Sequence, residues 1–362
     1  MSGAYEGMDR SAVVTGMARA LPGPLLDQSD IWAGHFAAHF AGDRVAQRIF
    51  LGAGVRRRHA AVNPVAEDIS GWSTGARMRR FLEEALPLGK EAVGAALADA
   101  GLRPEQVGQF TVVSCTGYAT PGLDIRIAAD LGMAPDLQRL LVGHMGCYAA
   151  IPALGAVADY VVSRGRPAVA LCCELTSLHV QPPTQDRGQL VSHALFGDAA
   201  TAIVVEPSTG ETGEGDHGLR VVDVAALTDP TTADHMTWDV TDVGFRMGLS
   251  PEVPRVLARH VRGLVRTLLD RNGLAIDEID GWAVHPGGPR ILDTVIEQLG
   301  LPADALDTSR AVLAEYGNCS SATVLLVLDA LRAEGRPRPG RTAVAMAFGP
   351  GLTLYATLLR AC

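Results

Sequence analysis

The sequence lacks the features that mark nucleic-acid-binding and membrane proteins. It has 31 Lys and Arg residues against 40 Asp and Glu residues, a formal net charge of −9, and its main basic cluster is Arg56–Arg58 with Arg48 shortly before it. Because phosphate-tracking surfaces are strongly basic, nucleic acid binding is not expected. No apolar stretch reaches about 18 uncharged residues, and no basic segment leads into an apolar one near the N-terminus. We therefore expect a soluble cytoplasmic protein without membrane association.

Cysteine pairs with CxxC spacing are also absent. The six cysteines stand at positions 115, 147, 172, 173, 319 and 362, mostly inside apolar stretches, and none forms a CxxC pair. Tetrahedral zinc sites usually need such pairs, so no metal site is expected. With no sign of secretion, we expect free thiols rather than disulfides.

The composition is that of a layered α/β protein. Of the 362 residues, 48% are hydrophobic and 20% are charged, with 40 Gly and 21 Pro, which suits strands and helices joined by tight turns. The length favours two packed halves over one core. The Gly-rich acidic segment 208–218 is predicted to be a surface loop between halves spanning residues 1–218 and 219–362.

Helical and strand periodicities alternate along both halves, as in a duplicated βαβαβ plan. The patterns predict helices over 87–100, 123–132, 147–165, 251–272, 289–299 and 320–334. They predict strands over 109–117, 137–146, 167–176, 279–284 and within 341–360, with a turn and a strand over 193–207.

Three reactive side chains follow predicted strands or turns: Cys147 in HMGCYAA, His285 in WAVHPGGP and Asn318 in EYGNCSS. In layered α/β proteins, ligands bind at such junctions. A thiol in the first turn of a helix is favoured as the thiolate. Each residue also has a structural explanation: a small buried cysteine, a core histidine and a helix cap. Together, however, a thiolate and two hydrogen-bond donors are the set needed to attack a thioester and stabilise an enolate.

These residues lie in segments that resemble the type III polyketide synthases, the chalcone and stilbene synthase family. The resemblance runs from about residue 45 to the end of the chain, and its order and spacing match the family. The segments are SCTGYATPG (114–122), GHMGCYAA (143–150), CCELTSLHVQP (172–182), ALFGDAA (194–200), VHPGGPRILD (284–293), YGNCSSA (316–322) and AFGPG (347–351).

The resemblance implies a thiolase-like fold, in which two pseudo-twofold-related βαβαβ halves form five αβαβα layers, and a homodimer with a tunnel to the active site. It implies that Cys147 receives a starter acyl group from coenzyme A, paired as thiolate with the His285 imidazolium. His285 and Asn318 would hold malonyl-CoA and stabilise the enolate left by CO2 loss. Repeated extension and cyclisation would give a pyrone, a resorcinol or another aromatic ring. Coenzyme A thioesters would be substrates, and no tightly bound cofactor is expected.

The resemblance also assigns the cavity wall. Phe196 aligns with a gatekeeping aromatic, Met247 occupies the place of a second one and would widen that side, and the Trp238 indole would limit chain growth. Thr120-Pro121 aligns with a loop that reaches the dimer partner's cavity, and its peptide bond is expected to be cis. The further wall residues are Cys115, Thr116, Thr176, Gly349 and Pro350, and the candidates for binding the coenzyme A phosphates are Arg48 and Arg56.

Three alternatives remain at this point. A ketoacyl synthase III-like enzyme would condense once on an acyl carrier protein, but HPGGPR differs from that family's histidine motif and no basic docking patch is evident in the sequence. A non-catalytic relative would not need all three reactive residues. A simple thioesterase would use Cys147 for hydrolysis alone.

Overall fold

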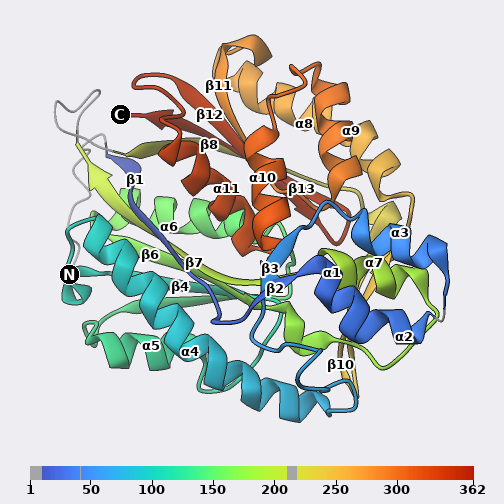
Figure 1. Cartoon of the computed structure of the whole chain (residues 1–362). Coiled ribbons are helices and arrows are strands. Elements are labelled where there is room, and N and C mark those ends of the chain that lie inside the picture. Colours follow the sequence, from blue (N-terminus) through green and yellow to red (C-terminus); the bar gives the residue numbers. More distant parts are fainter. Residues whose placement is uncertain (1–9, 41, 210–217) are drawn as a thin grey trace.

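A nine-stranded mixed sheet runs through the computed structural model, which describes residues 10–40, 42–209 and 218–362 (Figure 1). The strand order is β11-β12-β13-β8-β1-β7-β6-β4-β5. The strands are β1 (Ser11–Ala20), β4 (Gln109–Ser114), β5 (Gln138–Gly143), β6 (Ala168–Leu175), β7 (Asp198–Ser208), β8 (Leu219–Thr228), β11 (Ile279–Val284), β12 (Thr342–Gly349) and β13 (Thr353–Ala361).

The pairing pattern repeats on the two sides of the β1–β8 junction. On one side β4–β6 is parallel and β6–β7 and β7–β1 are antiparallel. On the other side β11–β12 is parallel and β12–β13 and β13–β8 are antiparallel. Within the described residues, the strands of the two sides pair where Ala12–Val14 meets Leu219–Val221. The division at residues 218 and 219 stays a prediction, and the loop predicted over 208–218 lies largely outside the described residues.

Two apolar helices form the central layer. α6 (Ala150–Arg164) and α11 (Ala322–Ala333) are buried on most faces and share one core cluster with strands from both sides of the sheet. α4 (Thr74–Asp99) and α5 (Leu123–Leu131) cover one outer face, while α8 (Val253–Arg271) and α9 (Pro289–Leu299) cover the other (Figure 1). Of the helices in the described residues, none is long and apolar enough to cross a membrane.

Most predicted elements are confirmed to within a few residues, but two helix starts were wrong. α4 begins at Thr74 and not at Pro87, which lies inside the helix. Proline removes one backbone hydrogen bond, but Pro87 and Glu83, one turn earlier, are both exposed, so water can reach the unpaired Glu83 carbonyl. α6 begins at Ala150, so Cys147 occupies the turn before the helix.

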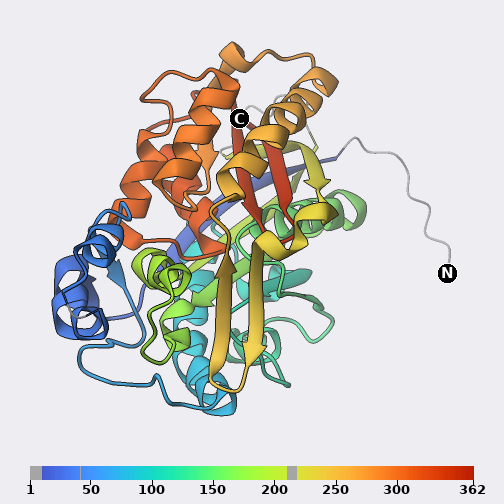
Figure 2. The ribbon, with the colours of Figure 1, turned by 90° about the vertical axis from the view of Figure 1, so that its right-hand side faces the viewer.

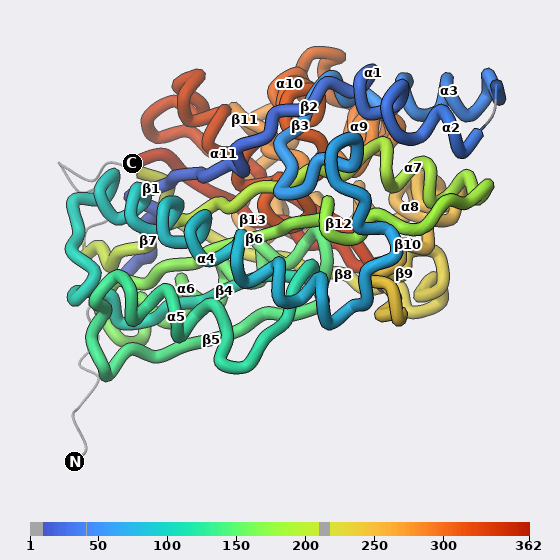
Figure 3. The backbone as a smooth tube through the Cα atoms, turned by 60° about the horizontal axis from the view of Figure 1, so that its bottom comes forward, coloured from blue at the N-terminus to red at the C-terminus, as the bar shows by residue number. Residues whose placement is uncertain are grey.

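Other elements fall in segments for which the sequence patterns predicted none, or only a turn. α7 (Arg187–Leu195) occupies part of the segment predicted as a turn, and α10 (Asp307–Tyr316) precedes Asn318. The strands β9 (Met236–Thr241) and β10 (Gly244–Leu249) form a hairpin, seen as two gold strands in Figure 2. Near the N-terminus, α1 (Gln28–Ile31), η1 (Trp32–Phe36), α2 (Ala37–His39) and α3 (Arg44–Leu51) pack through aromatic side chains, close to α7 (Figure 3).

Candidate active site

Cys147 lies in a tight turn between β5 and α6. Gly146 makes this turn possible because its φ of +83° is unfavourable for other residues. A Cβ atom at Gly146 would also stand 2.7 Å from Cδ of Pro350, so the position has no room for a side chain. The Cys147 side chain is buried, with 6% of its surface exposed.

Asn318 is brought to Cys147 by an unusual backbone arrangement. Its backbone N–H donates to the Leu195 carbonyl (2.8 Å), and its own carbonyl accepts from the Gly197 N–H (3.0 Å). The side-chain Oδ1 accepts from the Ser320 N–H (2.9 Å) and lies 4.0 Å from the Cys147 Sγ. The expected role of Asn318 as a helix cap is thus partly correct, because its Oδ1 accepts a hydrogen bond from the backbone just before α11. The amide NH2 is the part of this side chain that can donate to a substrate.

His285 follows β11 and is almost fully buried, with 1% of its surface exposed. Neither ring nitrogen has a hydrogen-bond partner in the described part of the chain. The ring packs edge-on against Phe348, with 5.8 Å between the ring centroids. Buried polar atoms normally have partners, so these two nitrogens are well suited to a substrate oxygen.

The segment from Phe348 to Pro350 connects the two reactive groups. Phe348 contacts His285, and a Cβ atom on Gly349 would stand 3.3 Å from the Cys147 backbone nitrogen and 2.9 Å from the Tyr148 ring. Gly349 therefore allows the β12 backbone to approach Cys147 closely. His285 is not among the residues that line the cavity at Cys147.

Burial governs the charge of both reactive groups. It lowers the pKa of His285 to about 3 and raises the pKa of Cys147 to about 12, although hydrogen bonds to Ser320 and Asn318 lower the latter. Both effects favour a thiol and a neutral imidazole. The imidazolium–thiolate pair implied by the resemblance is opposed by this burial and stays a prediction.

Cys147 opens into a small cavity of about 310 Å³. Seven of the eight predicted wall residues line it, and Gly349, the eighth, lies behind Cys147. The seven are Cys115, Thr116, Thr176, Phe196, Trp238, Met247 and Pro350.

The sequence analysis missed Ser320 and Glu174. Ser320 lines the cavity, has a positive φ of 48°, and places its Oγ 3.1 Å from the Cys115 Sγ. Glu174 is fully buried behind the wall and accepts hydrogen bonds from Ser321 Oγ (2.6 Å) and Thr116 Oγ1 (2.7 Å). Burial raises the pKa of Glu174, while these bonds act in the opposite direction. A carboxylate inside the otherwise apolar strand AVALCCEL was the available signal.

His179 and Trp238 form one rigid aromatic wall. The His179 Nδ1 accepts from the Phe245 N–H (3.0 Å), so its Nε2–H donates to the Thr116 carbonyl (2.7 Å). Burial lowers the pKa of His179 to about 3, so the ring is neutral and stacks on Phe245 at 4.4 Å between centroids. The Trp238 indole N–H donates to the Cys115 carbonyl (2.7 Å). His179 therefore contributes an uncharged ring, with both nitrogens hydrogen-bonded, to this wall.

A second cavity of about 570 Å³ lies beyond this wall. It shares Thr176, Phe196, Trp238 and Met247 with the cavity at Cys147, so these side chains stand between the two spaces. Much of its remaining lining is apolar and comes from the N-terminal part of the chain, including Leu26, Ile31, Phe36, Val62 and Pro64.

The predicted phosphate-binding arginines differ in their surroundings. Arg48 is exposed on α3, and Arg56 is exposed but pairs with Glu315 at 2.6 Å. Arg58, from the same basic run, is buried and donates to the carbonyls of His193 (2.8 Å) and Ala194 (2.7 Å). It therefore anchors the end of α7 and is not a surface cation. The Thr120–Pro121 peptide bond is cis, as expected.

Both halves of the chain match one known family. The profile described as "Chalcone and stilbene synthases, N-terminal domain" matches residues 9–208, and "Chalcone and stilbene synthases, C-terminal domain" matches residues 222–362.

Individual relatives agree. The chain is 36% identical over 362 residues to 1,3,6,8-tetrahydroxynaphthalene synthase of Streptomyces peucetius subsp. caesius, covering 98% of this chain and 94% of the relative. It is 32% identical over 370 residues to the alpha-pyrone synthesis polyketide synthase-like Pks18 of Mycobacterium tuberculosis (strain CDC 1551 / Oshkosh), covering 96% and 90%. The crystal structure of PKS-I from the brown alga Ectocarpus siliculosus superposes with a TM-score of 0.90 at 30% identity, covering 99% of this chain and 100% of the other. The expected thiolase-like α/β fold is thereby confirmed.

Proposed function

The chain belongs to the chalcone and stilbene synthase family as a bacterial-type type III polyketide synthase, and on this premise we propose that Cys147 carries the growing acyl chain. Enzymes of this family are acyltransferases that condense acyl-CoA and malonyl-CoA with loss of CO2. The observation that supports the proposal is the position of the Cys147 thiol. It lines a cavity and lies 4.0 Å from the Asn318 carboxamide.

Loading begins with the Cys147 sulfur attacking the carbonyl carbon of an acyl-CoA. His285, neutral because it is buried, accepts the thiol proton and passes it to the departing coenzyme A sulfur. The Cys147–acyl bond forms as the acyl–coenzyme A bond breaks. The neutral imidazole has a nitrogen free to accept the proton, but a pKa of about 3 makes it a weak base, so the step requires substrate binding to raise the pKa of His285 toward the operating pH.

Extension uses the same donors on the second substrate. The Asn318 NH2 and a His285 N–H would donate to the thioester oxygen of malonyl-CoA and stabilise the enolate formed as CO2 leaves. The enolate carbon attacks the Cys147 thioester and releases the sulfur, which lengthens the chain by two carbons. Phe196, in the wall of both cavities, would help to exclude water from this step.

We infer that the product is a small aromatic ring or pyrone. The relatives compared above are named for a tetrahydroxynaphthalene and an alpha-pyrone. The cavity at Cys147 is small, and Trp238 forms part of its wall. A chain confined there can extend only a few times before it folds back and cyclises.

We also propose that the protein is a homodimer that covers the β5 edge of the sheet. β5 is the last strand in the sheet order, and Leu140 and Leu141 are 38% and 48% exposed on it. Exposed apolar edge strands are normally covered. Light scattering should give twice the mass of one chain, and Leu141→Lys should shift it toward the monomer. Monomeric unmodified protein at micromolar concentration would refute the proposal.

The proposed chemistry is tested with purified protein, a panel of acyl-CoA starters and labelled malonyl-CoA. We expect labelled extended products and an acyl adduct on the protein by intact-mass measurement. Cys147→Ala should abolish both, and Cys362→Ala, a partly exposed cysteine at the chain end, should leave both unchanged.

Three results would contradict the proposal. Hydrolysis without any extended product would indicate a thioesterase. A single extension that requires carrier-protein malonyl thioester would indicate a ketoacyl synthase III-like enzyme. The absence of any adduct with all starters would indicate a non-catalytic relative.

A further inference from the structure

The turn between β12 and β13, residues 350–352, forms part of the wall at Cys147. Pro350 lines the cavity, and a Cβ atom at Gly146 would stand 2.7 Å from its Cδ. Leu352, at the other end of the turn, is buried, with 1% of its surface exposed. The position of Pro350 against the Cys147 turn therefore depends on how Leu352 is held.

Leu352 is held by an interrupted strand ladder. β8 and β13 pair antiparallel as far as Thr228 and Thr353, so Asp229 and Leu352 are the next pair in register. The Asp229 N–H donates to the Leu352 carbonyl at 2.9 Å. In a hydrogen-bonded antiparallel pair the two residues exchange both bonds. Here the return bond, from the Leu352 N–H to the Asp229 carbonyl, is replaced by a relay through a side chain.

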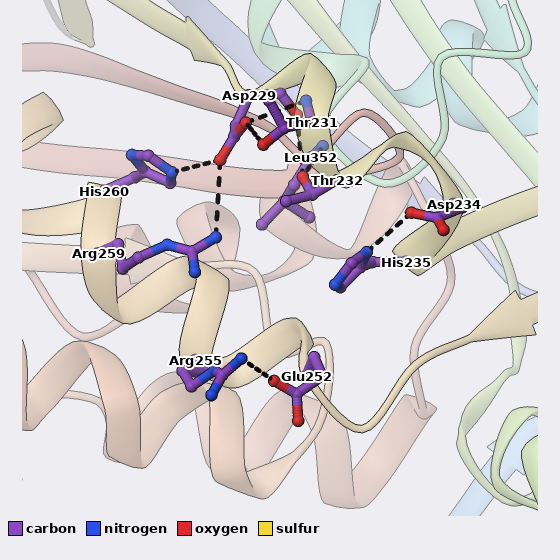
Figure 4. Close-up of polar contacts among 10 residues, drawn as sticks. All are labelled: Asp229, Thr231, Thr232, Asp234, His235, Glu252, Arg255, Arg259, His260 and Leu352. Carbon is purple, nitrogen blue, oxygen red and sulfur yellow. Dashed lines mark hydrogen bonds and ion pairs between the residues drawn. The ribbon is translucent and has the colours of Figure 1, made fainter.

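The relay is the hydroxyl of Thr232, which is 3% exposed. Its Oγ1 accepts from the Leu352 N–H (2.9 Å) and donates to the Asp229 carbonyl (2.9 Å), as Figure 4 shows. One hydroxyl thus joins the two groups that would otherwise bond each other. A direct N–H···O bond spans about 2.9 Å, so the inserted oxygen holds the two backbones farther apart at this point than an unbroken ladder would.

The Asp229 carboxylate fixes η4 (Pro230–His235), the short helix that contains the relay threonine. Its Oδ1 accepts from the Thr231 N–H (3.1 Å), and its Oδ2 accepts from the His260 Nε2 (2.8 Å) and lies 3.7 Å from Arg259 on α8 (Figure 4). Hydrogen bonds from Thr231 and His260 lower the pKa of Asp229 to about 2, so this carboxylate is charged at neutral pH. The start of η4 is therefore tied to α8.

The relay lies where two segments of the cavity wall meet. η4 leads directly into β9, which carries Trp238, and the β12–β13 turn carries Pro350. Thr232 bonds the first segment to the second through Leu352. A shift at Thr232 would therefore move Pro350 relative to Trp238, and both side chains line the cavity at Cys147.

We propose that Thr232 is a positioning residue that holds the β12–β13 turn at the distance from Cys147 that chain extension requires. Without the hydroxyl, the Leu352 N–H and the Asp229 carbonyl either stay unpaired, which is unfavourable for buried groups, or bond each other directly. Direct bonding would close the ladder and draw the turn toward η4. Thr232 lines neither cavity and acts through Leu352. The proposal rests on the proposed function, because extension at Cys147 is its main readout.

The test compares Thr232→Val, which removes the hydroxyl and keeps the shape, with two other variants. Thr232→Ser keeps the hydroxyl. Thr357→Val is the matched control, because Thr357 is buried on the same strand β13, its Oγ1 donates to the Asp223 carbonyl (3.1 Å), and it lines neither cavity. For each protein we measure the steady-state rates with an acyl-CoA starter and labelled malonyl-CoA, the lengths of the products and the Tm.

We expect Thr232→Val to lower the kcat of extension about tenfold, because small displacements of reacting groups have large effects on rate. The KM for the acyl-CoA should change less than about twofold, and the products should shift toward chains released early. Thr232→Ser should recover most of the rate. Thr357→Val should lower the Tm by a similar amount and keep the kcat and the products of the unmodified protein.

Two results would overturn the proposal. One is a folded Thr232→Val variant with the kcat and the product lengths of the unmodified protein. The other is an equal loss of kcat in Thr357→Val. If Thr232→Val does not fold, Asp229→Asn is used instead, because it weakens the attachment of η4 to α8. A lower kcat and shorter products are then expected, and unchanged values of both would overturn the proposal.

If the unmodified protein forms no extended product, the proposed function fails and the reactivity of the Cys147 thiol decides the positioning. Its alkylation by iodoacetamide is followed by mass spectrometry of peptides. The rate should rise about threefold or more in Thr232→Val, because a loosened turn opens more often, and should stay unchanged in Thr357→Val. Equal rates in the two variants would overturn the positioning role.

Discussion

Replacing Trp238 by alanine should join the two cavities and lengthen the product. The indole lies in the wall of both the cavity of about 310 Å³ and the cavity of about 570 Å³, and its N–H donates to the Cys115 carbonyl at 2.7 Å. Without the indole, a growing chain could pass from Cys147 into the apolar space beyond. We expect a longer polyketide from the same starter, and acceptance of longer acyl-CoA starters.

The stability change should be moderate. Replacing a fully buried large aromatic side chain by alanine lowers the free energy of unfolding by about 3 to 5 kcal/mol. Trp238 is only half-buried, so we expect a loss of about 3 kcal/mol, including the lost hydrogen bond. For a chain of this size that corresponds to a fall in Tm of roughly 5 °C. The variant should therefore be folded at 25 °C, which makes its products interpretable.

Two further variants separate size from hydrogen bonding. Trp238→Phe keeps most of the bulk and loses the N–H donor, so its product length should stay near that of the unmodified protein. Trp72→Ala removes a half-buried indole packed against another cluster and should change stability without changing products. Mass spectrometry of the products is the assay. An unchanged product distribution from folded Trp238→Ala would refute the view that the indole separates the cavities.

Three other predictions concern the turn at Cys147, the buried histidines and the anchor of α7. Gly146→Ala should lower the rate of condensation more than tenfold, because a Cβ atom there meets Pro350 at 2.7 Å. The control Gly101→Ala has a similar φ of +69° but open space around it, so it should lower only the stability, by about 1 to 2 kcal/mol. Product formation and urea unfolding measure the two effects, and equal activities of the two variants would contradict the clash. His179 and His285 have a pKa of about 3 in the folded state, below the unfolded value of 6.5, so their contribution to stability is fully present above pH 6.5 and is lost as the pH falls. Between pH 6.5 and 5.5 each should lower the free energy of unfolding by about 1 kcal/mol. His179→Gln should reduce this dependence of the free energy of unfolding on pH, measured by urea unfolding, and an unchanged dependence would show that His179 is not held neutral. Arg58→Met should destabilise the protein by about 3 kcal/mol, because the carbonyls of His193 and Ala194 lose their hydrogen-bond donor. Thermal unfolding measures this loss, and a change under about 0.5 kcal/mol would contradict the anchoring role of Arg58.

The three candidate reactive residues stand out in the sequence because local motifs carry them, and their catalytic role stays a prediction. Cys147 follows a glycine between strand and helix patterns, and Asn318 stands in a glycine turn before an apolar helix. The start of α6 at Ala150 was missed because three residues of turn share the apolar composition of the helix. The unpartnered nitrogens of His285 could not be predicted, because they depend on packing between β11 and Phe348, far apart in the chain.

The features that the sequence did not reveal depend on contacts across long separations. The tautomer of His179 is set by Thr116 and Phe245, which are 63 and 66 residues away. The second cavity is built partly by Leu26 and Ile31, from a segment with no motif. Arg56 and Arg58 are neighbours in the sequence, yet one pairs with Glu315 at the surface and the other is buried.

The segment from Phe348 to Pro350 touches the surroundings of both reactive groups, since it packs on the His285 ring, on the Cys147 backbone and under Gly146. An insertion or deletion there would disturb the surroundings of both side chains. The wall side chains Trp238 and Met247 lie elsewhere, opposite each other on the β9–β10 hairpin. New specificities are therefore expected to arise by exchanging wall side chains on that hairpin, while the length of the β12–β13 turn stays fixed.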